Sequence, residues 1–196
     1  MKRLSSLVVL TVVIGAMATL DVGPASAKEC KGVGFPDQIQ VAGSALKLNG
    51  LGLRQATIMK INVYVAALYV ASASTDANAI LASNTPKALV LHFVRDVGGG
   101  DLNKAWEEGF ATNAKDRLPA LKERIGKLKG WMADMKSGQR LTFTHKPGAG
   151  IEVDVNGTVK GTVEGDDFAT AFLSIWLGGQ PPNPGLKSGL LGGACG

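Results

Sequence analysis

Cysteine, histidine and tyrosine are scarce in this chain of 196 residues, which has two of each. Two cysteines without a histidine cluster do not make a structural zinc site, which takes four such ligands. A serine–histidine–aspartate triad would have to use His92 or His145. The sequence also has no P-loop, no Gly-x-Gly-x-x-Gly after a predicted strand and no Gly-x-Ser-x-Gly turn. It therefore lacks the usual motifs of nucleotide-binding proteins and serine hydrolases.

Charge is sparse as well, at 19% of residues with a net charge of +5. Without the N-terminal leader described next, residues 28–196 carry 19 basic and 15 acidic residues, a net charge of +4. These charges are dispersed, whereas nucleic-acid-binding proteins gather basic residues into patches. We therefore expect no nucleic-acid partner. The apolar content of 45% and the length indicate one globular domain with a core of its own.

The apolar run in the leader, Leu7 to Leu20, is only 14 residues long, and a membrane-spanning helix needs roughly 20. Two basic residues precede this run, and Ala25-Ser26-Ala27 follows it with the small-x-small pattern that signal peptidase accepts. We therefore predict a signal peptide at residues 1–27 and a single mature domain at residues 28–196 without a membrane span. The predicted location is periplasmic or secreted.

Cys30 and Cys195 lie near the two ends of the mature chain. In an oxidising compartment such a pair usually forms a disulfide. The bond would close almost the whole chain, a loop for which the chain-entropy model gives about 4–5 kcal/mol of stabilisation. Lipid attachment at Cys30 is the alternative, but the preceding Ala-Lys-Glu is too polar for lipoprotein processing. We predict the disulfide.

The spacing of apolar residues predicts a mixed order of elements. Strands are predicted at 38–41, 45–48, 51–61, 62–71 and 88–95, with Asn49-Gly50 as a hairpin turn. Helices are predicted from Asp101 and from about Arg117 to Met135. Strands at 140–146, 151–155 and 158–163, with a turn at Asn156-Gly157, precede a last helix from Asp166 or Asp167. This order indicates an α+β fold, an antiparallel sheet with helices on one face.

Arg54 is the first candidate for a binding residue, because it lies in a strand pattern away from other charges. A buried arginine must be neutralised. It would either meet an internal carboxylate or hold an anionic ligand, which a guanidinium grips at two points. A solvent-exposed edge position is the alternative. Arg95 is a second candidate, with pairing to Asp96 or a surface position as its alternative.

Three separated segments resemble the chalcone isomerase-like family, in its bacterial exported branch. The first is Leu48-Asn49-Gly50-Leu51-Gly52-Leu53-Arg54, followed by Lys60 to Tyr69. The second comprises Phe93-x-Arg95-Asp96-Val97 and Ala105-Trp106-x-x-Gly109. The third joins Gly165-x-x-Phe168, Ile175-Trp176-Leu177-Gly178 and Leu186-Lys187-x-x-Leu190-Leu191-Gly192. The resemblance covers residues 33–192 and implies an open-faced β-sandwich, a large antiparallel sheet packed against a layer of helices with a ligand cleft between them.

The resemblance also implies roles for single residues. In the plant enzymes, which cyclise a chalcone to a flavanone, an arginine matching Arg54 stabilises the anionic substrate. The place of their threonine falls roughly at Asn62, and no tyrosine follows the strand at 88–95. Tyr64 or Tyr69 could substitute, but five residues apart they face opposite sides of a regular strand. Because losing one oxyanion donor costs about 10²–10³ in rate, these departures disfavour flavonoid chemistry.

Fatty-acid-binding relatives, which keep the arginine, are the better comparison. We therefore expect a non-catalytic exported protein that binds a small amphipathic anion such as a fatty acid. The candidate ligand-binding residues are Arg54, Asn62, Tyr64, Tyr69 and Arg95. One alternative is an intramolecular lyase acting on an enone-like substrate. Another is a haem-binding protein, as some mitochondrial relatives are, with His92 as the only strand histidine available; otherwise we expect no cofactor and no metal.

Overall fold

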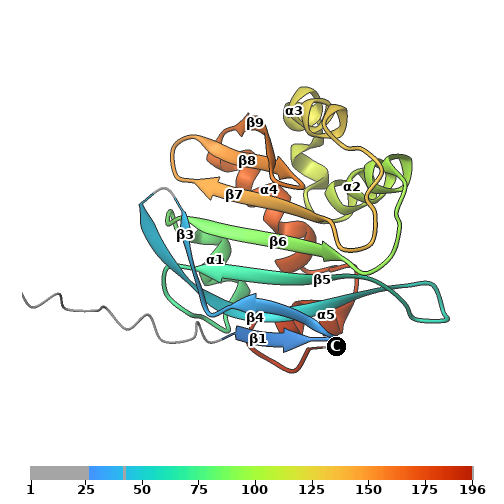
Figure 1. The fold of residues 1–196 in the computed structure, drawn as a ribbon. Helices are drawn as coiled ribbons and strands as arrows, with labels where there is room; N and C mark the ends of the chain where they lie inside the picture. The colour runs from blue at the N-terminus through green and yellow to red at the C-terminus, as the bar shows by residue number, and fades with distance from the viewer. Residues whose placement is uncertain (1–26, 42, 196) are drawn as a thin grey trace, which may run out of the picture.

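The computed structural model describes residues 27–41 and 43–195. The predicted signal peptide lies outside the described residues except for Ala27, which begins strand β1 (Ala27–Cys30). β1 forms a hairpin with β2 (Val33–Pro36). Seven further strands form one antiparallel sheet in which spatial order follows chain order (Figure 1). They are β3 (Gln38–Val41), β4 (Ser44–Ala56), β5 (Ile61–Val70), β6 (Lys87–Phe93), β7 (Arg140–Lys146), β8 (Gly150–Val155) and β9 (Thr158–Glu164).

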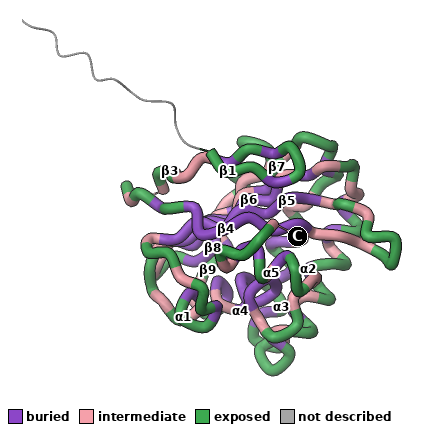
Figure 2. Tube along the Cα trace, turned by 90° about the horizontal axis from the view of Figure 1, so that it is seen from below, coloured by how far each residue is buried: buried purple, intermediate pink, exposed green. Residues whose placement is uncertain are grey.

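The helices gather on one side of this sheet, and β1 lies on the other (Figure 2). They are α1 (Ala77–Ala82), α2 (Gly99–Asn113), α3 (Leu118–Gly130), α4 (Asp166–Leu177) and α5 (Pro184–Leu190). The predicted α+β architecture, an open-faced sandwich of a large antiparallel sheet and a helix layer, is confirmed. No helix of the described residues is long and apolar enough to cross a membrane.

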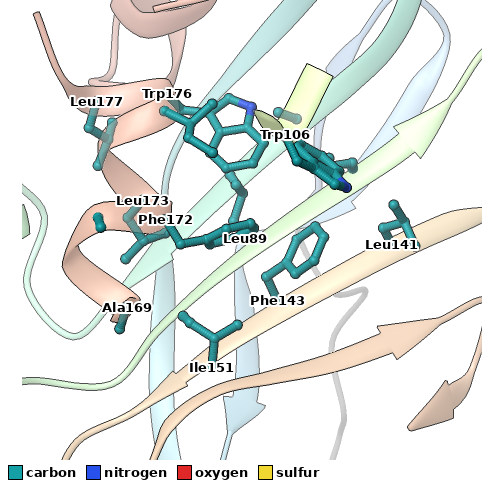
Figure 3. Close-up of a cluster of buried hydrophobic side chains, with 14 of the residues drawn as sticks. Leu89, Trp106, Leu141, Phe143, Ile151, Ala169, Phe172, Leu173, Trp176 and Leu177 are labelled. Atoms are coloured by element: carbon teal, nitrogen blue, oxygen red, sulfur yellow. The ribbon is translucent and has the colours of Figure 1, made fainter. Parts of the chain in front are cut away.

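The alternation of side chains along β5 divides the buried residues into two clusters. Tyr64, Ala66 and Leu68 face the helices, while Val65 and Tyr69 face the β1–β2 hairpin. Between the sheet and the helices, aromatic rings from α2, α4 and β7 pack together (Figure 3). Each such side chain stabilises the fold by roughly 1.5–3 kcal/mol when fully buried. This aromatic cluster comprises Trp106, Phe110, Phe143, Phe168, Phe172 and Trp176.

The hairpin turn predicted at Asn49-Gly50 is wrong. Both residues lie within β4, at an irregularity in its pairing with β5. The buried Asn49 amide donates to the carbonyls of Leu190 and Ser74 and accepts from the Ser74 amide. A Cβ on Gly50 would lie 2.1 Å from the Gly189 carbonyl oxygen, so glycine is needed for α5 to pack against this strand. Long-range contacts thus replace the turn that the dipeptide favours locally.

The other boundaries differ less. The turn between β4 and β5 lies at residues 57–60, so the strand predicted over 51–61 ends earlier. α2 begins at Gly99, before Asp101, and α3 ends at Gly130 rather than at Met135. The predicted Asn156-Gly157 turn between β8 and β9 is confirmed. β1, β2, α1 and α5 were not predicted.

A disulfide joins Cys30 in β1 to Cys195, as predicted. The two residues are 165 positions apart in the sequence. Cys30 is buried in the cluster on the β1–β2 side of the sheet, and Cys195 packs against that cluster. The bond therefore fastens the N-terminal hairpin to the segment that follows α5.

Candidate functional site

A cleft of about 820 Å³ opens at one end of the sheet, within the ~300–1,000 Å³ usual for small-molecule sites. It lies where the β4–β5 hairpin, the end of β6, α2 and the last turn of α4 meet. Its apolar lining includes Val63, Val97, Leu102, Ala105, Trp106, Ile175, Trp176 and Pro182. Its polar lining includes Arg54, Tyr64, Arg95, Asp96, Asp101, Lys104 and Glu108. The mixture suits a ligand with an apolar body and a charged end.

Arg54 lines this cleft from β4 and is half-buried. Its Nη1 donates to three neutral acceptors, the carbonyls of Gln55 and Pro182 and the Asn183 side chain. Among the described residues no carboxylate lies within ion-pair distance of Arg54. The sequence left open whether Arg54 pairs with an internal carboxylate. Among the described residues it does not.

The remaining donors of Arg54 matter for binding. None of the hydrogen bonds among the described residues uses its Nε or Nη2. The bonds from Nη1 fix the guanidinium against the α4–α5 connection, at distances of 3.3 Å to Pro182 and 3.0 Å to Asn183. A guanidinium held on one side and free on the other presents a preorganised fork to an incoming carboxylate.

Tyr64 is the register partner of Arg54 on β5 and lines the same cleft. It is buried, and its hydroxyl accepts a hydrogen bond from Trp176 Nε1 at 3.0 Å. Burial raises the pKa of Tyr64 to about 12, against smaller lowering effects of Trp176 and Arg54. The hydroxyl keeps its proton at neutral pH, so it can donate a hydrogen bond in addition to the one it accepts from Trp176.

Trp106 adds a second indole to the cleft wall. Its ring lies 5.5 Å from that of Trp176, centroid to centroid (Figure 3). The buried Nε1 of Trp106 has no hydrogen-bond partner among the described residues. A buried donor without an acceptor is costly.

Arg95 lies at the exposed rim of the cleft, just after β6. It does not form the ion pair with Asp96 that the sequence left open, because Asp96 accepts from Lys136 and from the Ser137 amide. Those two bonds lower the pKa of Asp96, the Ser137 bond most. Arg95 is thus a second cation that lines the cleft, near the Asp96 carboxylate.

Two of the predicted ligand-binding residues lie outside the cleft lining. Asn62 is exposed, and its side chain accepts a hydrogen bond from Gln55 Nε2. Tyr69 faces the opposite side of the sheet, where its hydroxyl donates to the Pro36 carbonyl. For Tyr69 the reason is the period of two along β5, which sends Tyr64 and Tyr69 to different faces. Asn62 lies beyond an irregularity in the β4–β5 pairing, between Arg54 and Gln55. Neither Asn62 nor Tyr69 is among the residues that line the cleft with Arg54.

His92 also lies on the side of the sheet away from the helices. It pairs with Val65, a member of the cluster on the β1–β2 side, and its ring meets Phe35 edge-on. Its Nδ1 accepts from Arg140 Nε at 3.0 Å. Burial and the nearby Arg140 lower the pKa of His92. As placed, this histidine cannot ligate a haem bound in the cleft between sheet and helices.

The cleft includes residues that the sequence reasoning missed. Trp106 and Trp176, which the sequence analysis did not propose as binding residues, belong both to the core and to the cleft wall. Pro182 and Asn183, which hold Arg54, come from the connection between α4 and α5. The spacing of Leu186 and Leu190 was the available signal for α5, whose docking brings this connection to β4. Within the part of the chain that the structure describes, no cluster of residues could hold a metal ion.

Comparisons with known proteins agree with this architecture. A family model described as chalcone isomerase-like matches residues 27–192. A solved structure of a fatty-acid binding protein from Arabidopsis thaliana superposes with a TM-score of 0.61 at 16% sequence identity, over 85% of this chain and 96% of that one. A search of curated proteins gave no match. On the extent of the family match, this chain belongs to the chalcone isomerase-like family.

Proposed function

We propose that this protein is exported and binds a small amphipathic anion, such as a fatty acid, in the cleft between sheet and helices. One observation carries the proposal. Arg54 lines a cleft with both apolar and charged walls, is oriented by three neutral acceptors, and has no carboxylate within ion-pair distance among the described residues. A guanidinium in that setting is neutralised best by the acid group of a ligand.

The geometry supports a particular orientation of the ligand. Its carboxylate would accept from the free edge of Arg54 and from the protonated Tyr64 hydroxyl, since the two residues are register partners. Its apolar body would lie along the indoles of Trp106 and Trp176 and the side chain of Ile175. This arrangement fixes the polar end and leaves the tail to apolar contacts, which are tolerant of chain length.

Two further observations support the proposal. The similar solved structure is that of a fatty-acid binding protein, so this fold can serve that function. The N-terminal leader and the Cys30–Cys195 disulfide are typical of exported proteins. The lyase alternative lacks such support, because Asn62, in the place of the enzymes' threonine, lies outside the cleft lining.

A displacement titration tests the proposal. A fluorescent fatty acid is bound to the mature protein and displaced by laurate or by 1-dodecanol, which has the same chain length without the charge. We expect Arg54→Ala to weaken laurate binding by about 10–100-fold, the range of a charge-assisted hydrogen-bonded pair. Dodecanol binding should change less than about threefold, because it makes no ion pair.

Mass spectrometry of molecules extracted from the purified protein provides a second test. Acids should be recovered from wild type and depleted in Arg54→Ala. Equal recovery from both, or equal loss of laurate and dodecanol affinity, would contradict the role of Arg54. Conversion of naringenin chalcone above its spontaneous rate, followed by absorbance, would favour the lyase. A Soret band after haem titration would favour haem binding.

A further inference from the structure

The turn between β4 and β5 carries the two most exposed large apolar side chains among the described residues. Ile58 is 100% exposed and Met59 is 79% exposed. Figure 1 shows this hairpin projecting from the body of the molecule. Most exposed apolar residues need no explanation, but two adjacent ones at the tip of a projection mark a contact surface.

The backbone of this turn is held in an unfavourable conformation. Thr57 has φ of 61° and Lys60 has φ of 51°, the left-handed region that a β-branched threonine rarely adopts. The Lys60 amide donates to the Thr57 carbonyl at 3.1 Å, and the Met59 amide donates to the Thr57 hydroxyl. Such strain collects at functional positions. Here it presents Ile58 and Met59 outward between two strained residues.

The charged residues of the β4–β5 hairpin are all basic. Lys60 is the only charged residue between Gln55 and Thr75, and no acidic residue occurs from Gln38 to Thr75. The tip is apolar, a lysine adjoins it, and its two strands carry no carboxylate. It therefore complements a bilayer surface, where anionic headgroups cover an apolar layer. The three carboxylates that line the cleft, Asp96, Asp101 and Glu108, come from other segments of the chain.

We infer that the tip of this hairpin, residues 57–60, docks on a lipid bilayer that contains anionic lipids. Ile58 and Met59 enter the interfacial region, and Lys60 contacts the headgroups. The same turn borders the cleft, which Ala56 and Thr57 help to line. Docking therefore places the cleft entrance next to the membrane surface. The inference rests on the hairpin alone and holds whatever the cleft binds.

A bilayer fits the tip better than a protein partner does. A stable protein interface buries roughly 800 Å² on each side and involves some 20–30 residues. The exposed apolar surface here consists of two adjacent side chains on a narrow hairpin. Two inserted side chains and one lysine would give weak, reversible attachment to a membrane surface, because even a single acyl chain binds only marginally.

Sedimentation with vesicles tests the inference. The mature protein is mixed with vesicles of phosphatidylcholine alone or of phosphatidylcholine and phosphatidylglycerol at three to one. We expect wild type to partition onto the anionic vesicles and Ile58→Ser/Met59→Ser to lose at least about tenfold of its partition coefficient. Lys60→Gln should reduce binding to anionic vesicles by a few-fold, and added salt should diminish that difference.

Val159→Ser is the matched control, because Val159 on β9 is the third large apolar residue that is mostly exposed among residues 27–41 and 43–195, at 58%. It should bind as wild type does. Circular dichroism confirms that all variants are folded. The inference is overturned if wild type binds neither vesicle, or if the double variant binds as tightly as wild type. A concentration-dependent dimer that the double variant abolishes, without vesicle binding, would identify the tip as a protein contact instead.

Discussion

The indole nitrogen of Trp176 donates a hydrogen bond of 3.0 Å to the hydroxyl of Tyr64, joining α4 to β5 in the wall of the cleft. The bond occupies a lone pair of the hydroxyl and leaves its proton for another acceptor. Because burial raises the pKa of Tyr64 to about 12, that proton is retained at neutral pH. Helix α4 thus orients the Tyr64 hydroxyl, which in our proposal donates a hydrogen bond to the ligand.

Tyr64→Phe tests that assignment. We expect laurate affinity to fall by roughly 10–100-fold through the loss of one hydrogen bond to a charged group. The free energy of unfolding should also fall, by about 1–3 kcal/mol, because Trp176 Nε1 loses its acceptor. Displacement titration and urea unfolding measure the two effects.

Tyr69→Phe is the control for this prediction. It removes a hydroxyl from the same strand, but on the opposite face, where Tyr69 donates to the Pro36 carbonyl. We expect a loss of stability of similar size and an unchanged affinity for laurate. Equal losses of affinity in both variants would show that Tyr64 acts through the fold and not on the ligand.

Close packing of α5 against β4 makes Gly52 irreplaceable. A Cβ at this position would lie 2.3 Å from the carbonyl oxygen of Leu186, a backbone atom that cannot move without displacing α5. We expect Gly52→Ala to lower the free energy of unfolding by about 3 kcal/mol or more, at the upper end of overpacking. Gly126→Ala, in an open position on α3, should instead raise it by roughly 0.5–1 kcal/mol. A destabilisation of less than about 1 kcal/mol by Gly52→Ala would contradict this packing.

The buried Lys87 makes the free energy of unfolding depend on pH in the alkaline range. Lys87 is 2% exposed, and its Nζ contacts the carbonyls of Ser83 and Thr85 and Nδ1 of His145. Burial lowers the pKa of Lys87 from 10.5 to about 8, although Asp166 acts in the opposite direction. Between these two pH values the unfolded chain binds more protons than the folded one, so stability gains from this residue as pH rises.

Urea unfolding of wild type and Lys87→Met from pH 8 to pH 10 measures this contribution. The difference in unfolding free energy, wild type minus variant, should rise by about 2 kcal/mol over this range. Both proteins contain Tyr64 and Tyr69, whose raised pKa values act in the opposite direction above pH 10, so the subtraction removes them. A difference that stays constant or falls with pH would show that Lys87 is not desolvated.

We expect loss of the disulfide to lower the free energy of unfolding strongly. Cys30–Cys195 closes a loop of 165 residues, for which the chain-entropy model gives about 5 kcal/mol. Replacing both cysteines with serine should lower the free energy of unfolding by up to that amount while laurate binding persists at low temperature. The bond lies with the cluster on the β1–β2 side, opposite the helix layer. Loss of binding in a folded variant would contradict this separation.

Much of the fold could be predicted because its signals are local. The alternation along β5 correctly placed Tyr64 and Tyr69 on opposite faces, and Asn156-Gly157 forms the turn that it favours. Asn49-Gly50 has the same local preference, yet contacts with Ser74 and Leu190 keep it in β4. Those contacts depend on where α5 docks, which periodicity does not encode.

The site was predictable only in part for the same reason. Arg54 was identified because a charge within an apolar strand pattern is costly. What holds it, the carbonyl of Pro182 and the side chain of Asn183, lies more than 120 residues away. Asn62 pairs with Gln55 beyond an irregularity in the β4–β5 pairing, between Arg54 and Gln55, and its side chain accepts a hydrogen bond from Gln55 outside the cleft lining. Pairings of this kind come from tertiary structure.

A crystal structure of the mature protein with laurate tests the central claim most directly. We expect one carboxylate oxygen within about 2.7–3.0 Å of Arg54 Nε or Nη2 and the other at the Tyr64 hydroxyl, with the alkyl chain beside Trp106. A laurate molecule whose carboxylate points to solvent, or one bound away from the cleft while Arg54 keeps only its neutral partners, would contradict the claim.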